Sequence, residues 1–313
     1  MHLHDFVTQF WPSTVDGLTL GAIYALFALG YTLVYGVLKL INFAHSEVFM
    51  VGTMAAMWVL HLTGATDGEV GLTLVGALLL AAAVAMAGSA ATALTLERVA
   101  YRPLRRRGAS RLAALISAIG ASFVLQQTFE DFYSNQYSAV PRVLAQHVLF
   151  HIGAGQVTNI VVLIIVAAAV MMVALERTVA LTKLGRGIRA VAQDPETATL
   201  MGVNIDRTIM VTFLLGGLMA GVAAVLWDVR FAQTRFDIGF LPGIKAFTAA
   251  VLGGIGNIRG ALLGGIIIGL LELYGASLFG SQWRDTTVFV VLVAVLLFRP
   301  TGLLGESLSR ARA

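Results

Sequence analysis

Long apolar runs separated by short polar segments dominate the chain. A helical run of about 20 apolar residues matches the roughly 30 Å hydrocarbon layer of a bilayer, and no run has the two-residue alternation of a membrane β-barrel. The runs predict membrane-spanning helices near 14–38, 42–62, 70–96, 112–129, 156–175, 207–228 and 286–298, and a shorter pair within 244–280. The predicted fold is an all-α polytopic helical membrane bundle of about 8–10 membrane helices, forming a single transmembrane domain over residues 1–313.

The shorter pair is divided by the sequence GNIRG at 256–260. Its two apolar stretches of about 13 to 17 residues are short for a full crossing of the bilayer. Broken backbone within a membrane is stable only where it is buried in protein or lines a watery cavity. We therefore expect a broken or re-entrant pair of helices here.

The charges of the loops predict the orientation of the helices. The loop 98–111 holds six arginines, and the segment 176–189 holds Arg177, Lys183, Arg186 and Arg189. Positively charged loops stay in the cytoplasm. The segments 63–69 and 130–155 carry Asp67, Glu69, Glu130 and Asp131 against the single Arg142, and are expected outside. This pattern places the N-terminus outside, and Arg299, Arg310 and Arg312 place the C-terminus in the cytoplasm.

Composition agrees with a membrane protein and excludes several other classes. The chain is 58% hydrophobic and 12% charged, with a net charge of +4. Its basic residues lie in short loops between apolar runs, so they predict membrane orientation and no nucleic-acid partner. The chain has no cysteine, and His147 and His151 stand four residues apart without a further ligand, so no metal site is predicted.

No enzyme motif is present. None of the three lysines, Lys39, Lys183 and Lys245, follows a glycine as in a phosphate-binding loop, and neither H-E-x-x-H nor G-x-S-x-G occurs. We therefore expect a protein that is not an enzyme, has no catalytic residue and binds no cofactor itself.

A weak internal repeat relates two of the predicted helices. The stretches GLTLGAIYAL at 17–26 and GLMAGVAAVL at 217–226 share Gly, Leu, Gly and Leu in the same places. The first runs inward and the second outward, as in an inverted-topology pseudo-repeat of a transporter. The alternative is that glycines four residues apart serve only close helix packing.

The cytoplasmic segment 184–204 predicts a short helix outside the membrane. Asp194 suits the N-cap, Pro195 suits the first helical position, and Glu196 and Thr197 complete the first turn. Such a helix is either a lever that a separate ATPase grips or an ordinary capped loop helix.

Several stretches resemble one family of permeases. GRGIRAVAQDPETATLMGVN at 185–204, INFAH at 41–45, KAFTAAVLGGIGNIRGALLGG at 245–265 and FRPTGLLGE at 298–306 are similar to motifs of the permease subunits of branched-chain amino acid ABC importers. Within the first stretch, Glu196, Ala198 and Gly202 match the coupling motif of ABC permeases. The family usually has glycine where this chain has Ser46. The resemblance runs from about Gly17 to Gly305.

The resemblance implies an importer of branched-chain or related small amino acids in the cell membrane, of which this chain forms one transmembrane half. Its partners would be a second, paralogous permease subunit, two cytoplasmic ATPase subunits that bind ATP and Mg, and an extracellular solute-binding protein. The implied coupling residues are Arg186, Arg189, Asp194, Pro195, Glu196, Ala198 and Gly202. A urea or short-amide importer permease and an ion-coupled secondary transporter remain alternatives, the latter disfavoured because it needs carboxylates near the bilayer midplane.

Polar residues within predicted helices are candidates for the translocation path, because such residues are costly in a membrane. The candidates are Asn42, His45, Ser46, Gly253, Gly254, Gly256 and Asn257. In the alternative interpretation, Asn42 caps the helix that follows it and His45 ties two helices together. Glu47 and Glu272 are further ionisable candidates. Glu97 and Glu176 are expected to pair with neighbouring arginines at cytoplasmic helix ends, and Asp228 to be an interface charge beside Arg230. Gln126 and Gln127, the outer segment that follows them and 228–243 are expected to form an extracellular surface. This surface either receives the binding protein or consists of ordinary solvated loops.

Overall fold

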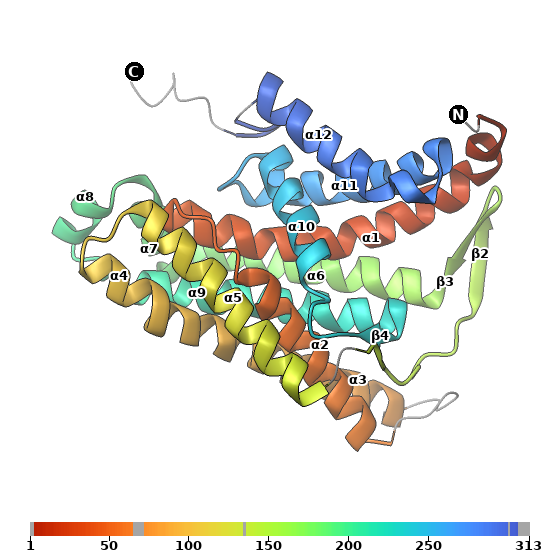
Figure 1. Cartoon of the computed structure of the whole chain (residues 1–313), viewed down its shortest axis with the longest axis horizontal. Coiled ribbons are helices and arrows are strands. Elements are labelled where there is room, and N and C mark those ends of the chain that lie inside the picture. Colours follow the sequence, from red (N-terminus) through yellow and green to blue (C-terminus); the bar gives the residue numbers. More distant parts are fainter. Residues whose placement is uncertain (1–2, 65–71, 134–135, 300, 306–313) are drawn as a thin grey trace. The chain divides into compact units, whose positions relative to one another are not determined.

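The computed structural model describes residues 3–64, 72–133, 136–299 and 301–305. Asp67, Glu69, Arg310 and Arg312, which support the predicted orientation, lie outside these residues. The helices are α1 (Leu3–Leu38), α2 (His45–Leu62), α3 (Leu72–Leu96), α4 (Arg102–Arg106), α5 (Arg111–Tyr133), α6 (Asn159–Leu181), α7 (Lys183–Gln193), α8 (Pro195–Leu200), α9 (Ile205–Phe231), α10 (Phe240–Gly253), α11 (Ile258–Phe279) and α12 (Arg284–Phe298). Figure 1 shows these helices coloured along the sequence. A π-helical turn, η1 (Glu97–Tyr101), joins α3 to α4, and a 3-10 turn, η2 (Ser281–Trp283), precedes α12.

Four short strands form two antiparallel pairs. β1 (Ser138–Ala139) pairs with β4 (Gln233–Thr234), and β2 (Val148–Ile152) forms a hairpin with β3 (Gly155–Thr158). In the first pair Ser138 lies opposite Thr234. This pairing joins the first part of the segment 130–155 to the segment 228–243, both of which are expected outside, so these parts lie at the same end of unit 2.

The predicted helical membrane architecture is confirmed. Seven helical segments of the described chain are long and apolar enough to cross a membrane. α2 is not among them, because His45 and Glu47 dilute its apolar content. α10 is a shorter apolar helix of 14 residues. α11 has 22 residues and is long enough to cross, so the expectation of two short helices is wrong for this member.

The chain divides into two compact units, which we describe separately. Unit 1 comprises residues 1–32, 146–171 and 244–313, and unit 2 comprises residues 33–145 and 172–243. In unit 1, α1 packs closely on α11: a methyl group added to Gly21 would lie 2.8 Å from the Cα atom of Ile266, and one added to Gly17 would lie 3.0 Å from that of Leu270. Small residues at these positions therefore let the two backbones touch.

Unit 2 shows the same kind of contact. Here α2, α3 and α9 pack against one another. A methyl group added to Gly217 would lie 2.8 Å from the Cα atom of Ala90 in α3, and one added to Gly221 would lie 2.6 Å from that of Met86. The two members of the weak repeat thus use glycines at the same places for close helix packing.

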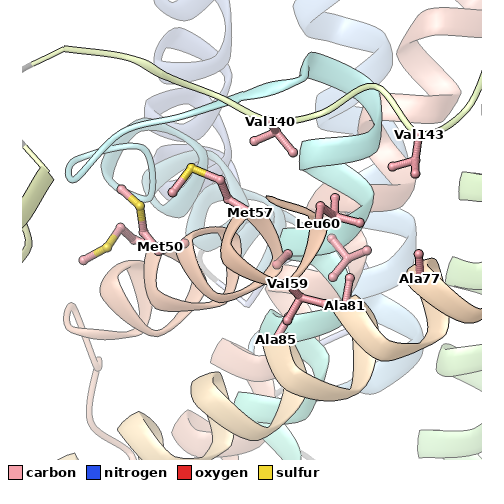
Figure 2. Close-up of a cluster of buried hydrophobic side chains, with 12 residues drawn as sticks. Met50, Met57, Val59, Leu60, Ala77, Ala81, Ala85, Val140 and Val143 are labelled. Atoms are coloured by element: carbon pink, nitrogen blue, oxygen red, sulfur yellow. The ribbon is translucent and has the colours of Figure 1, made fainter. Parts of the chain in front are cut away.

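An apolar cluster stabilises unit 2. Figure 2 shows side chains of α2 and α3 together with Val140 and Val143 from the segment between α5 and β2. Val225 of α9 completes the cluster. The segment that contains β1 is therefore held against α2 and α3 as well as paired with β4.

Candidate translocation and coupling sites

The chain after α9 turns back into unit 2. α9 ends at Ala232, which has a left-handed backbone with φ of 53°. Thr234 follows and lies 2.7 Å from the hydroxyl of Thr53 in α2, with both residues fully buried. A side chain on Gly239 would collide with the carbonyl oxygen of Ser46. The irregular segment 232–239 is therefore packed against α2 through its two buried residues, Thr234 and Gly239, which is where non-helical backbone in a membrane is tolerated. α10 begins directly after this contact.

Asn42 does not cap α2, contrary to the prediction. The N-cap of α2 is Ala44, and no side chain accepts a hydrogen bond there. Asn42 is buried, and its Oδ1 accepts a hydrogen bond of 2.9 Å from the hydroxyl of Tyr101. The Tyr101 ring lies 5.3 Å from that of Phe213 in α9. Asn42 thus ties the chain before α2 to the π-helical turn η1, and such turns often occur at functional sites.

His45 and Ser46 are both buried in unit 2. The Ser46 hydroxyl lies 2.7 Å from the carbonyl oxygen of Phe43 and 3.0 Å from Oε1 of Glu47, and it can donate to either. The larger side chain at this position, where the related family usually has glycine, therefore satisfies backbone at the start of α2 and contacts Glu47.

Glu47 is the centre of a buried polar group that the sequence did not reveal. Its Oε1 accepts hydrogen bonds from the Ser122 hydroxyl at 3.0 Å and from Nε2 of Gln126 at 2.8 Å. Gln126 was expected near an outer surface, and this is wrong because its side chain turns toward α2. Gln127 lies on the exposed side of α5 and donates to Asp131. Two adjacent glutamines give no sequence signal for which of them faces the core.

Asp228 was expected to be an interface charge, and the structure places it in the interior instead. It is 1% exposed, and neither carboxylate oxygen has a hydrogen-bond partner among the described residues. Its burial follows from helical spacing, because Asp228 lies seven residues after Gly221 and eleven after Gly217 and so shares the helix face that packs on α3. That spacing was visible in the sequence.

Glu97 forms the ion pairs expected of it. Arg102 donates to its two oxygens at 3.1 and 2.8 Å, and Arg105 lies at 3.4 Å. Arg105 and Arg106 also bind Asp206 at the start of α9, at 2.5 and 2.8 Å. These bonds join the arginine-rich loop 98–111 to the chain that follows α8, so the two segments predicted to be cytoplasmic lie at the same end of unit 2.

The predicted helix in the segment 184–204 is present as α8. Oδ1 of Asp194 accepts hydrogen bonds from the backbone of Glu196 at 3.0 Å and of Thr197 at 3.3 Å. A further bond from the Thr197 hydroxyl to Oδ2, 2.5 Å long, is the main reason that the pKa of Asp194 lies below its usual value. Pro195 occupies the first turn, as expected.

Two large apolar side chains are exposed at the C-terminal end of α8. Leu200 is 88% exposed and Met201 is 80% exposed, whereas Ala198 is buried against the rest of unit 2. Gly202 follows with φ of 82°, a conformation that other residues adopt at a cost. Arg189 of α7 donates to the backbone carbonyls of Val179 and Ala180 at the end of α6, so α7 is fixed to that helix. Arg186 is exposed.

The glycine-rich candidates lie in unit 1 and form a turn. Gly254 and Gly256 have φ of 106° and 97°. Asn257 caps α11 by accepting from the backbone of Arg259 and Gly260, and its Nδ2 donates to the carbonyl oxygen of Leu304 at 2.9 Å. This cap was not predicted, and it gives Asn257 a structural role.

The C-terminal segment is paired with the same turn. Leu303 and Leu304 donate to the carbonyl oxygens of Leu252 and Gly253 at 2.8 and 2.9 Å. A side chain on Gly253 would collide with the backbone of Gly260. The GGIGN and TGLL stretches therefore belong to one local structure.

A second charged group lies in unit 1, with Lys245 and Glu272 buried and Arg284 and Asp285 partly exposed. Oε1 of Glu272 lies 2.9 Å from Nζ of Lys245 and 2.6 Å from Nε of Arg284. Lys245 also contacts Asp285 at 2.6 Å. The two positive and two negative charges balance, which is the arrangement that permits burial of charge in an apolar environment.

The helices and their buried polar groups define a class, the multi-pass helical membrane proteins. The chain matches the family model described as "Branched-chain amino acid transport system / permease component" over residues 13–298. This match covers most of the chain, which therefore belongs to the branched-chain amino acid transport permease family.

Curated relatives agree with this assignment. The high-affinity branched-chain amino acid transport system permease protein BraD of Pseudomonas aeruginosa is 44% identical over 306 residues, which are 96% of this chain and 97% of BraD. LivH of Escherichia coli, with the same description, is 40% identical over 95% of this chain and 96% of its own length. A probable branched-chain amino acid permease LivH of Methanocaldococcus jannaschii is 28% identical over 90% of this chain and 88% of its own. These relatives are transport permeases and not enzymes.

Proposed function

We propose that this chain is a transmembrane subunit of an ABC importer and forms half of the translocation path for branched-chain or related small amino acids. A second, paralogous permease subunit supplies the other half. Two cytoplasmic ATPase subunits bind ATP and Mg and drive transport, and an extracellular solute-binding protein delivers the amino acid. The names and near full-length coverage of the relatives support this proposal.

The observation that carries the proposal is α8. A helix of six residues, capped by Asp194 and preceded by a second helix anchored on α6, presents Leu200 and Met201 with most of their surface open. Large exposed apolar side chains next to arginines are typical of a surface that another protein covers. The residues assigned to ATPase coupling are Arg186, Arg189, Asp194, Pro195, Glu196, Ala198 and Gly202.

Within this set, the structure supports two different roles. Glu196 and Arg186 are exposed and available to an ATPase subunit. Asp194, Ala198 and Gly202 hold the shape of α8 through its cap, its buried contact and its left-handed end. Rigid attachment is needed if motion of the ATPase is to reach the membrane helices.

Asn42, His45 and Ser46 are proposed to border the path in unit 2, next to the irregular segment 232–239. Buried non-helical backbone beside polar side chains is the usual setting of a transporter site. We propose that Gly253, Gly254, Gly256 and Asn257 act by keeping the turn before α11 narrow. The proposed orientation has the N-terminus outside and the C-terminus in the cytoplasm, with α8 and α4 on the cytoplasmic face.

Cysteine chemistry tests the docking surface and the orientation together, because the chain has no native cysteine. Met201→Cys is the test variant, and Leu62→Cys at the opposite end of unit 2 is the control, with 80% and 81% exposure of the native side chains. We expect Met201→Cys to crosslink to an ATPase subunit in the assembled complex and Leu62→Cys to react with a membrane-impermeant maleimide from outside. Absence of a crosslink from Met201→Cys, or external labelling of this variant, would contradict the proposal.

Uptake into proteoliposomes tests the transport function itself. The complex of both permeases and the ATPases, with the binding protein added, is expected to accumulate radiolabelled leucine in a reaction that needs ATP and is blocked by vanadate. Uptake that is insensitive to vanadate and abolished by ionophores would instead identify an ion-coupled transporter.

A further inference from the structure

Four carboxylates are fully buried in the described part of the chain: Glu47, Glu97, Asp228 and Glu272. They differ in how their charge is compensated. Glu97 is bound by Arg102 and Arg105, and Glu272 by Lys245 and Arg284, so each has two cationic partners. Ion pairs account for the burial of these two residues. They do not account for the other two.

Glu47 is held in place without being neutralised. Three neutral donors, the hydroxyls of Ser46 and Ser122 and the amide of Gln126, surround its Oε1 at 2.8 to 3.0 Å. Its Oε2 has no hydrogen-bond partner among the described residues. Neutral hydrogen-bond donors orient a carboxylate but do not neutralise its negative charge. Asp228, in contrast, has no hydrogen-bond donor on either oxygen among the described residues, so no donor orients its carboxylate.

The arginine of the segment that packs beside Glu47, Arg235, is already paired with another carboxylate. Arg235, in the segment 232–239, binds both carboxylate oxygens of Asp237 and lies 4.9 Å from the centre of the Tyr137 ring. The same segment packs Gly239 on Ser46, the residue before Glu47. Glu47 therefore presents an oriented acceptor, Oε2, that no described residue fills.

We propose that Oε2 of Glu47 receives the ammonium group of the amino acid during its passage, with Ser122 and Gln126 acting as positioning residues. An ammonium group supplies both the missing positive charge and hydrogen-bond donors, and charge-assisted hydrogen bonds are the strongest that a carboxylate forms. A buried acceptor left open costs free energy until a donor arrives. This inference rests on the proposed function, because it takes an amino acid as the solute.

Substitutions that separate charge from shape test this assignment in the reconstituted complex. Glu47→Gln keeps the volume and removes the charge, and Glu47→Asp keeps the charge at shorter reach. We expect leucine uptake to fall about tenfold or more in Glu47→Gln, the size of one lost charge-assisted hydrogen bond, and to recover partly in Glu47→Asp. Gln126→Ala is expected to reduce uptake less, and the matched control Gln127→Ala to leave it unchanged.

The outcomes distinguish the inference from the function on which it rests. If the wild-type complex accumulates no leucine, the proposed function fails. If the wild type and Glu47→Gln transport equally well, only the ammonium site is refuted, and a bound water then suffices for Oε2. If a protonophore at saturating ATP inhibits uptake by the wild type but not the residual uptake by Glu47→Gln, then Glu47 carries a proton, which also overturns the assignment. If Glu47→Gln does not assemble, equal uptake by Gln126→Ala and Gln127→Ala would refute the site.

Discussion

Replacing Gly221 by alanine, at the contact between α9 and α3, should have two opposing effects on stability: a gain in helix propensity and a loss from overpacking. Gly221 lies in the interior of α9, where alanine is ordinarily preferred over glycine by roughly 0.5–1 kcal/mol. A methyl group there, however, would lie 2.6 Å from the Cα atom of Met86 and 2.8 Å from the carbonyl oxygen of Ala85. Both neighbours are backbone atoms, so a side-chain rotation cannot relieve the contact.

The size of the effect follows from a comparison with Gly120 in α5, where an added methyl group meets nothing within 4 Å. The gain in helix propensity is common to Gly221→Ala and Gly120→Ala. Only the first also forces two helices apart, and overpacking of this kind costs about 1–3 kcal/mol. We therefore expect the two variants to differ in unfolding free energy by about 1–3 kcal/mol, with Gly120→Ala equal to or more stable than the wild type.

Thermal unfolding of the purified permease in one detergent, followed by intrinsic tryptophan fluorescence, measures this difference. The melting temperature of Gly221→Ala should fall below that of the wild type, whereas that of Gly120→Ala should not. Gly21→Ala, which meets the backbone of Ile266 at 2.8 Å in unit 1, should behave like Gly221→Ala. Equal melting temperatures for Gly221→Ala and Gly120→Ala would show that the helices are not in backbone contact.

Three further predictions concern polar contacts. Asp194→Ala should fray α8, which is measured as faster hydrogen exchange of the Thr197 amide, and should lower ATP-driven uptake. Hydrogen bonds lower the pKa of Asp194, so the wild-type cap should persist at neutral pH and be lost only as the pH falls below the usual range for aspartate. Asn257→Ala should cost about 1 kcal/mol for the lost helix cap and make the segment 301–305 more accessible to protease, whereas unchanged cleavage would deny the link to Leu304. Tyr101→Phe should destabilise the protein to heat by about 1–3 kcal/mol, because Asn42 Oδ1 then stays buried without its donor, and a melting temperature equal to that of the wild type would exclude the bond.

Sequence alone predicted the helices well because membrane helices are defined by long apolar runs. It also predicted the cap of α8 and the ion pairs of Glu97, since both depend on residues close together in the chain. The bonds of Glu47 to Ser122 and Gln126 join residues more than seventy positions apart, and apolar content does not reveal which helices meet. Asp228 was misjudged for a different reason. Asp228 was predicted at the membrane interface because it lies near the end of a predicted helix. Its helical spacing from Gly217 and Gly221 would have predicted its burial correctly.

The length of α11 was misjudged because glycines were read as a break. In the structure most of them serve packing, and only Gly254 and Gly256 in this stretch take backbone conformations that favour glycine. Gly265 and Gly269 remain helical and lie against the backbone of α1. Glycine content therefore marked close approach along most of the segment and a turn only at its start.

The glycines of the two repeat members pack on different helices. Gly17 and Gly21 of α1 pack on α11, whereas Gly217 and Gly221 of α9 pack on α3. If α1, α2 and α3 correspond to α9, α10 and α11, the first helix of each half packs on the third helix of the other half. Neither half then completes its own core, so a protein cut between the halves should not form two independent domains.

The packing of α9 on α3 also suggests how motion of the proposed coupling segment is transmitted to the proposed ammonium site. Both lie in unit 2, joined by α9, whose 27 residues extend roughly 40 Å at 1.5 Å per residue. At its start, α9 follows α8 and binds Arg105 and Arg106 through Asp206; at its end, it leads into the segment that packs on Ser46. Because Gly217 and Gly221 hold α9 in backbone contact with α3, it cannot slide without moving its neighbours. A displacement of α8 by an ATPase would therefore change the surroundings of Glu47 through one rigid helix.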